Sequence, residues 1–461
     1  MAFRGSQSYN MRGFKEVAMP TVLRCCSVIL VLCGLAAAPA FSQETPPADS
    51  FRFNMALGIG IQNFTGSVEP GTYSSIGLAP DISFGKFGIG LDLTINYNSS
   101  NGSLYVRRAD WAVDSFQDFL EVYLPKIAYI RYGVRSDPLF VEFGSFNDAT
   151  LGDGFIMGSY GNMLFMPDQR HLGLQADLDG SLFNAPFFGF ESVVGNLAQL
   201  DVMGGRFFVR PLVRTDVPIL SELEVGFTAA VDTNPFLDTL SVGNPSPIAV
   251  YGGDIRVPLV NLRNAFSLTA FTDVATIQSR SLGGMIGVGG RIINVFTYGL
   301  QLRALGADFI PDYFGPTYDL LRDQQYMIVQ TGGFSRAMLG WFATVGTSFL
   351  QDLFVFKVSL DGPFSPSPST DPLLRYPHLR GIVTIAEGVV PGVSFDFSYD
   401  KKAIATLSDL GSAEDAAIQA QLNFRTGPAV ISFLYKIVFD PTQSPHPWHV
   451  TSGLQSSIAL F

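Results

Sequence analysis

From residue 51 onward, apolar residues alternate with small or polar residues at a period of two. The first such stretch runs from Phe51 to Phe64, where the apolar positions are Phe51, Phe53, Met55, Leu57, Ile59 and Ile61. Successive side chains of a β-strand point to opposite faces, so the pattern predicts a strand with one apolar and one polar face. Residues 76–84 and 87–97 continue it on both sides of Gly85-Lys86, which predicts a hairpin.

The same alternation recurs to the C-terminus, in about 18 to 20 segments of about 9 to 13 residues each. Clear examples are residues 223–231, 296–302, 354–360, 393–399, 418–424 and 431–439. Strands of soluble proteins are mostly about 5 or 6 residues long, whereas a tilted membrane-spanning strand needs about 9 to 11. Short polar turns separate the segments, at Asp137-Pro138, residues 261–264, Gln351-Asp352 and Gly427-Pro428. The chain is therefore predicted to be all-β, a transmembrane antiparallel up-and-down barrel of roughly 16–20 strands.

Composition supports a membrane protein without helical spans. Charged residues make up 15% of the chain, against about 25% in soluble domains, and the mean hydropathy is +0.26. The longest uncharged apolar stretches, such as residues 337–351, reach about 15 residues, and a helical span needs about 20. A large soluble β protein and a membrane barrel remain, and strand length favours the barrel.

The N-terminus has the three-part layout of a secretory signal peptide. Basic residues precede an apolar run from Cys25 to Ala38, and small residues follow. We place cleavage after Ser42, with cleavage after Ala40 as the alternative, so residues 1–42 are the expected signal peptide and 43–50 a short periplasmic leader. All three cysteines lie in the segment to be removed, so the exported chain is expected to have no disulfide.

Charge and motifs exclude several function classes. Without its first 42 residues the chain keeps 25 basic and 39 acidic residues, a formal charge of −14, which argues against nucleic-acid binding. Nucleophilic catalysis needs a base beside the nucleophile. The only histidines are His171, His378, His446 and His449, and no Gly-x-Ser-x-Gly motif accompanies them. We expect neither an enzyme nor a cofactor.

Over residues 51–461 the chain resembles the bacterial outer-membrane β-barrel proteins of the porin-like class. The resemblance implies a location in the outer membrane of a bacterium with two membranes. It implies contact with outer-membrane lipid, with lipopolysaccharide as a further partner, and leaves homo-oligomer formation open. Recognition by the barrel-assembly machinery would use the last strand, Trp448–Phe461, which ends in an aromatic residue. That strand departs from the usual pattern, because Leu454, Ile458 and Leu460 lie out of phase with Phe461.

Four segments interrupt the alternation. Residues 99–126, which contain a helix-like stretch over residues 113–124, and residues 147–168 are long enough to be functional. We expect one of them to fold into the lumen as a constriction, with a solvated outer loop as the alternative. Residues 308–322 and 363–377 are expected to be exposed loops. Gly152-Asp153-Gly154 is interpreted as a tight turn, because neither an EF-hand nor a phosphate-loop spacing surrounds it.

The alternating phase also predicts the channel lining. Charged side chains facing lipid at mid-depth would cost about 2 to 4 kcal/mol each, so polar residues within the strands should point inward. The predicted lining is Asn54, Asp92, Asn96, Glu224, Asp254, Arg256, Arg291, Arg303, Lys357, Asp396 and Arg425. Its mixed charge predicts a channel for passive diffusion of small hydrophilic solutes, without a single-sign selectivity ring. The alternatives are a closed barrel that acts as an adhesin or surface structural protein, and a fatty-acid-type transporter, which would need an apolar lumen.

Overall fold

The computed structural model describes residues 51–64, 69–100, 103–135, 137–236, 245–262, 265–349, 353–365, 369, 371–440 and 447–460. The expected signal peptide and leader lie outside the described residues. So do the predicted turn at Gln351-Asp352, His446 and the terminal Phe461.

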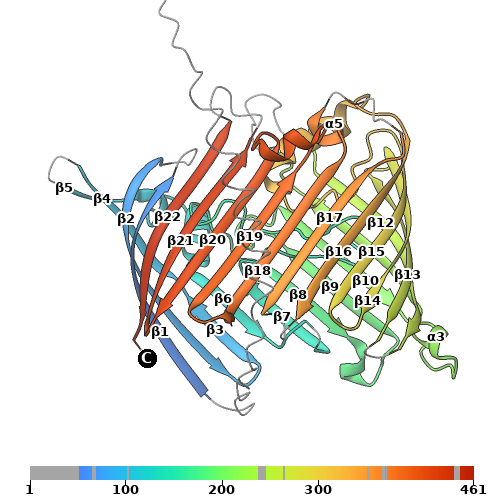
Figure 1. The fold of residues 1–461 in the computed structure, drawn as a ribbon, viewed down its shortest axis with the longest axis horizontal. Helices are drawn as coiled ribbons and strands as arrows, with labels where there is room; N and C mark the ends of the chain where they lie inside the picture. The colour runs from blue at the N-terminus through green and yellow to red at the C-terminus, as the bar shows by residue number, and fades with distance from the viewer. Residues whose placement is uncertain are drawn as a thin grey trace, which may run out of the picture. The chain divides into compact units, whose positions relative to one another are not determined.

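The described chain is one closed antiparallel sheet of twenty-two strands, in which β22 pairs with β1 (Figure 1). β3 and β4 pair with consecutive parts of β2, and β5 and β6 pair with β4 and β3 in turn. β3 with β4, and β5 with β6, therefore each form one interrupted strand of the wall. Counted in this way the barrel has twenty wall strands, which is within the predicted range. The strands are β1 (Phe51–Phe64), β2 (Gly71–Phe84), β3 (Phe87–Leu91), β4 (Leu93–Ser100), β5 (Ser103–Val106), β6 (Ile127–Tyr132), β7 (Leu139–Gly144), β8 (Gly173–Asp179), β9 (Phe188–Val194), β10 (Val202–Val209), β11 (Glu224–Asp232), β12 (Ile248–Asn261), β13 (Ser267–Ile277), β14 (Ser281–Ile292), β15 (Phe296–Leu305), β16 (Met338–Phe349), β17 (Phe354–Pro363), β18 (His378–Val390), β19 (Val393–Lys401), β20 (Ala416–Thr426), β21 (Ala429–Phe439) and β22 (Trp448–Ala459).

The register places the apolar phase of each strand on the outside of the wall. Ile59 pairs with Ile76 and Ile76 with Ile95, and the three side chains are 59%, 45% and 41% exposed. Neighbours across a ladder share a face of the sheet, so these residues form a continuous outer belt. An apolar belt this exposed is stable where lipid rather than water covers it.

The two ends of the barrel differ in the length of their connections. Short turns join β2 to β3, β18 to β19 and β20 to β21 at the end where the chain terminates, called here the turn end (lower end in Figure 1). The opposite end, called the loop end, carries the long connections before β8, β16, β18 and β20. The helix α5 (Tyr318–Thr331) lies there, and α3 (Pro218–Ser221) lies at the turn end (Figure 1).

The short helices lie in the connections. They are η1 (Arg108–Asp110), α2 (Phe116–Tyr123), η2 (Leu124–Lys126), η3 (Gly180–Phe183), η4 (Pro372–Leu374) and η5 (Leu407–Gly411). α2 begins within the stretch predicted to be helical, and its N-cap Ser115 accepts a hydrogen bond from the Asp118 N–H. No helix within the described ranges has both the length and the apolar character to span a membrane.

Two connections fold into the barrel and share an apolar core with its wall. The inner segment (residues 145–172) joins β7 to β8, and the α5 segment (residues 306–337) joins β15 to β16. Met157 and Phe314 form an isolated parallel bridge between the two, and both are fully buried. Inward wall residues such as Ile248 and Ile277 complete this core.

The expectation that residues 308–322 form a plain exposed loop is wrong. Phe309, Tyr313, Phe314 and Tyr318 are at most 2% exposed, because they pack on the inner segment. The expectation for residues 363–377 is wrong in part, since Leu373 and Leu374 are also buried in that core. Apolar side chains inside a barrel are removed from water as completely as those inside a soluble domain.

Candidate functional site

Ten of the eleven residues of the predicted lining lie in wall strands, and Asp92 lies between β3 and β4. Two members of the set are cross-strand partners, because Glu224 pairs with Arg256 between β11 and β12. Asp92, Asn96, Arg303 and Lys357 border open space in the lumen. Asn54, Arg291 and Arg425 lie near the turn end with exposed side chains, and Asp396 is half-buried. That the eleven line a conducting path stays a prediction.

Glu224, Asp254 and Arg256 belong to an ion-pair cluster within the wall. Its centre is Arg206 of β10, whose side chain is 1% exposed and contacts Asp254 through Nε at 3.1 Å and Nη2 at 2.6 Å. Glu191 lies 3.2 Å and Glu224 3.7 Å from the same guanidinium. Arg256 forms an ion pair with Asp153 in the inner segment. The cluster therefore fastens the turn at Gly152-Asp153-Gly154 to β12.

A second ion-pair cluster fastens the α5 segment. Arg322 lies 3.0 Å from Asp201, which directly precedes β10, and 3.1 Å from Asp232, the last residue of β11. It also lies 3.7 Å from Asp319 in its own helix. Tyr318 donates a hydrogen bond of 2.7 Å to Asp232. Paired and hydrogen-bonded charges are the form in which buried charge is tolerated. These contacts fix α5 against the loop end of the wall.

The first chamber is bounded by β20–β22, β1, β2 and β4 on one side and residues 163–171 on the other. It encloses about 2270 Å³, including its open ends. Most of its wall side is polar or small, and three leucines, Leu78, Leu434 and Leu454, also border it. The polar residues of the lining include Gln62, Thr94, Asn96, Gln419, Gln421, Ser432, Gln455 and Ser457. Gly58 faces this space, and a Cβ there would come within 2.7 Å of the Gln455 amide nitrogen.

Two hydrogen bonds and two ion pairs hold residues 163–170 in this chamber. Lys436 of β21 donates to the carbonyl oxygens of Met163 and Met166 at 3.2 and 3.4 Å. Arg170 forms a 2.7 Å ion pair with Asp92, and Arg107 pairs with Asp168. These anchors fix residues 163–170 to β21 and to Asp92 and Arg107, which lie next to β4 and β5.

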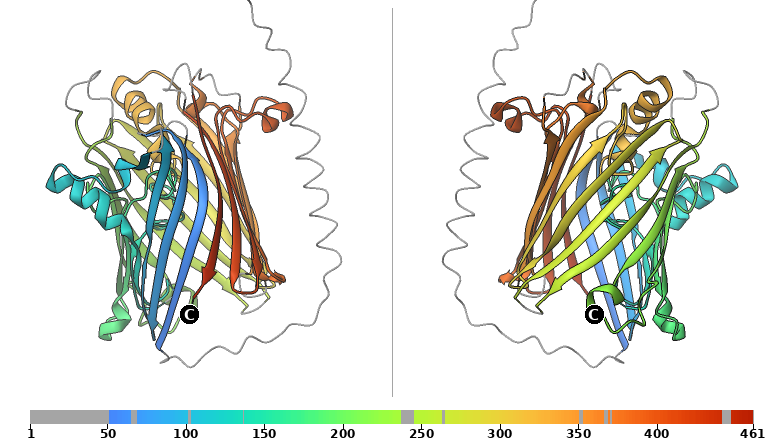
Figure 2. Two further views of the ribbon diagram at one scale, coloured as in Figure 1. Left: turned by 90° about the vertical axis from the view of Figure 1, so that its left-hand side faces the viewer. Right: turned by 90° about the vertical axis from the view of Figure 1, so that its right-hand side faces the viewer.

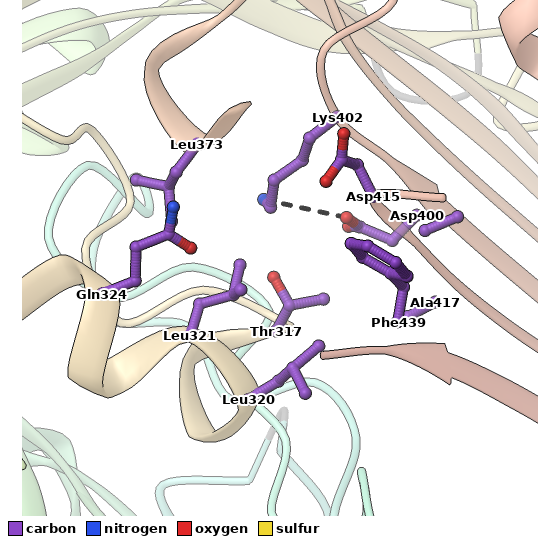
Figure 3. Close-up of a pocket in the computed structure, with 11 residues that line it drawn as sticks. Thr317, Leu320, Leu321, Gln324, Leu373, Asp400, Lys402, Asp415, Ala417 and Phe439 are labelled. Atoms are coloured by element: carbon purple, nitrogen blue, oxygen red, sulfur yellow. Dashed lines mark ion pairs between the residues drawn. The ribbon is translucent and has the colours of Figure 1, made fainter. Parts of the chain in front are cut away.

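The second chamber lies on the other side of the inner segment, against β14–β19, and encloses about 1530 Å³. Its basic side chains are Arg303, Lys357, Arg380 and Lys402. Arg303 pairs with Asp361 at 3.1 Å, and Lys402 with Asp400 at 3.8 Å. Among the described residues, no ion pair involves Lys357 or Arg380 within 4.0 Å. A small pocket between α5 and β19–β20 shares Lys402 and Asp400 with this chamber (Figure 3).

Burial shifts the pKa of two groups that the inner segments bring to the chambers. Burial raises the pKa of Asp312 well above its usual range, against the opposing charges of Arg380 and Arg303. The shift makes Asp312 easier to protonate than an exposed aspartate. Burial also lowers the pKa of His171 in the first chamber, where its Nδ1 lies 3.1 Å from the Asn196 amide nitrogen.

The sequence analysis missed several residues that shape the lumen. No alternation marks Arg206, because the phase that carries it in residues 202–209 also holds Val202 and Phe208. Arg107, Arg322 and Lys436 act through partners far away in the sequence; Lys436 and Met163 are 273 residues apart. No local pattern identifies such partners.

A closed antiparallel barrel with an apolar exterior and a polar interior is the architecture of outer-membrane proteins. This chain is an outer-membrane β-barrel. It belongs in the outer membrane of a bacterium with two membranes.

No protein-family model and no curated protein matches the chain. Among solved structures, OpdK of Pseudomonas aeruginosa with vanillate is 10% identical, with 89% of this chain and 98% of that chain covered and a TM-score of 0.31. A porin of Rh. blastica is 10% identical over 89% and 100%, with a TM-score of 0.27. Wzi of Escherichia coli, described as a carbohydrate-binding β-barrel, is 12% identical over 87% and 83%, with a TM-score of 0.31. Values this low carry nothing about what this chain binds or conducts.

Proposed function

We propose that the protein is a porin-like channel for passive diffusion of small hydrophilic solutes. The observation that carries the proposal is the first chamber, which lies beside the inner segment and has a wall rich in glutamine, serine, threonine, asparagine and glycine. Such side chains hydrogen-bond water and polar solutes, whereas a hydrophobic-substrate transporter would need an apolar lumen. The inner segment limits solute size in this proposal.

Reconstitution of the purified protein in a planar lipid bilayer tests the proposal. We expect stepwise, ohmic conductance, because a water-filled polar path passes ions at a rate proportional to voltage. Protein heated until its folded gel mobility is lost serves as the matched control and should give no steps. If the folded protein gave no conductance steps in repeated preparations, the channel proposal would be wrong. The closed barrel that acts as an adhesin or surface structural protein would then remain.

The second chamber predicts a preference for anions among the solutes conducted. A unit charge about 8 Å from a passing ion in water contributes about 0.5 kcal/mol, a factor of about 2 in permeability. The charge favours an anion and disfavours a cation by that factor, so each charge changes the anion-to-cation permeability ratio about fourfold. Replacing both unpaired cations, Lys357→Gln with Arg380→Gln, should therefore lower the ratio roughly sixteenfold. Reversal potentials in a salt gradient measure that ratio. Arg336→Gln, an exposed arginine at the loop end, is the control and should leave the ratio unchanged.

A further inference from the structure

The wall of the barrel is incomplete on the loop-end side of β6–β9. These four strands have only six or seven residues, whereas β1 and β2 have fourteen. In the described part of the chain, β5 pairs with β4 and with no strand on its other side. An unpaired strand edge does not persist against lipid unless another element covers it.

The helix α2 lies over this opening. Gln117 donates to the Ala198 carbonyl oxygen at 2.9 Å, and Gln199 donates to the Glu121 carboxylate at 3.2 Å. These contacts join α2 to the turn between β9 and β10, across the shortened strands. On its lumen side, Glu121 and Val122 line the first chamber. Figure 2 shows the helix, in cyan, on the outside of the wall.

The chain leaves and rejoins the wall at the level of the outer apolar belt. The Arg107 N–H donates to the Asn96 carbonyl oxygen, and the Asp92 N–H donates to the Lys126 carbonyl oxygen, both at 2.8 Å. Asn96 is adjacent in β4 to Ile95, which belongs to the belt that also includes Ile59 and Ile76. The segment carrying α2 is therefore attached within the height of the membrane-spanning wall.

The outward face of α2 is aromatic. Phe116, Phe119 and Tyr123 are 76%, 46% and 39% exposed, and their rings stack in succession with centroids 6.3 and 5.0 Å apart. Trp111 packs edge-on against Tyr123, and the Lys126 ammonium lies 4.1 Å from the Trp111 ring centroid. Tryptophan and tyrosine are enriched where a membrane protein meets the membrane–water interface. Lys126 itself borders the first chamber.

We infer that α2 is a membrane-embedded wall element, with its aromatic face in the lipid of the outer leaflet. The occupant of this face is the acyl-chain and headgroup boundary of the surrounding bilayer, because the face is continuous with the lipid-facing belt. The capped ends of the helix and its polar contacts with residues 198–199 satisfy hydrogen-bonding groups that lipid could not. In this inference α2 closes the wall where β6–β9 are too short to do so. The inference does not depend on whether the lumen conducts.

Site-directed spin labelling tests the inference. Cys25, Cys26 and Cys33 are the only cysteines, so with these replaced by serine a label can be placed at one site, Phe116→Cys or Phe119→Cys. Label accessibility to oxygen, which concentrates in lipid, and to a water-soluble nickel chelate would be measured in phosphatidylethanolamine–phosphatidylglycerol vesicles. Ile59→Cys on the belt is the lipid control, and Leu407→Cys, 85% exposed in η5, is the water control.

Labels on α2 should match the Ile59→Cys label, with high accessibility to oxygen and several-fold lower accessibility to the chelate than the Leu407→Cys label. Chelate accessibility equal to that of the Leu407→Cys label would overturn the inference and make α2 a solvated loop helix. Low accessibility to both reagents would overturn it too, because a second copy of the chain would then cover the face. Heat-modifiable gel migration checks that each variant is folded, and a label at Tyr123→Cys gives a further reading if one variant is not.

Discussion

Replacing Arg206 by methionine is expected to lower the free energy of unfolding by about 3–5 kcal/mol, the range found when one partner of a buried ion pair is removed. The guanidinium is 1% exposed and lies within 4 Å of three carboxylates, those of Glu191, Glu224 and Asp254. Methionine fills similar space but leaves the 2% exposed Asp254 carboxylate without its partner. Unfolding by urea in lipid vesicles, followed by tryptophan fluorescence, measures the loss.

Two further variants separate this charge effect from loss of packing. Arg336→Met makes the same substitution at an exposed position and should change the free energy of unfolding by less than about 0.5 kcal/mol. Arg206→Met combined with Asp254→Leu removes both members of the pair and should recover part of the loss, since no buried charge is then left alone. A loss below about 1 kcal/mol in the single variant would contradict a wall held by this cluster.

The wall could be predicted from the sequence because the alternation within each strand shows which of its side chains face outward. A period of two assigns every residue to one face, and the register leaves Ile59, Ile76 and Ile95 together on the outside without any long-range information. The first predicted strand, Phe51–Phe64, has the bounds found in the structure. Closure adds only the pairing of the last strand with the first.

The interior could not be predicted in the same way, because it depends on segments that fold back into a barrel. Residues 308–322 have no strand period and stand between long strands, as an exposed loop would. Their aromatic residues Phe309, Tyr313 and Phe314 were the available signal of burial, because large apolar side chains are uncommon in a fully solvated loop. The Asp153–Arg256 pair joins residues 103 positions apart and has no signature in either local sequence.

The apolar core inside the barrel leads to the second large effect, on Phe314. Its side chain is fully buried and packs on Tyr318 and Tyr313 at ring-centroid distances of 4.7 and 5.2 Å. Its backbone N–H and carbonyl oxygen bond to Ile156 and Gly158 of the inner segment. Removing a buried phenylalanine side chain costs about 3–5 kcal/mol. Phe314→Ala should therefore loosen the inner segment from the α5 segment by about that amount.

The loss should fall on the interior rather than on the wall, because the wall ladders do not include Phe314. We expect larger and noisier conductance steps in a planar bilayer, together with nearly unchanged heat-modifiable migration of the barrel. Phe364→Ala, at a side chain 63% exposed at the loop end, is the matched control and should leave both readouts as they are. Unchanged conductance in Phe314→Ala, with stability lost, would mean that the inner segments do not limit the path. The restriction would then have to lie in the wall of the first chamber itself.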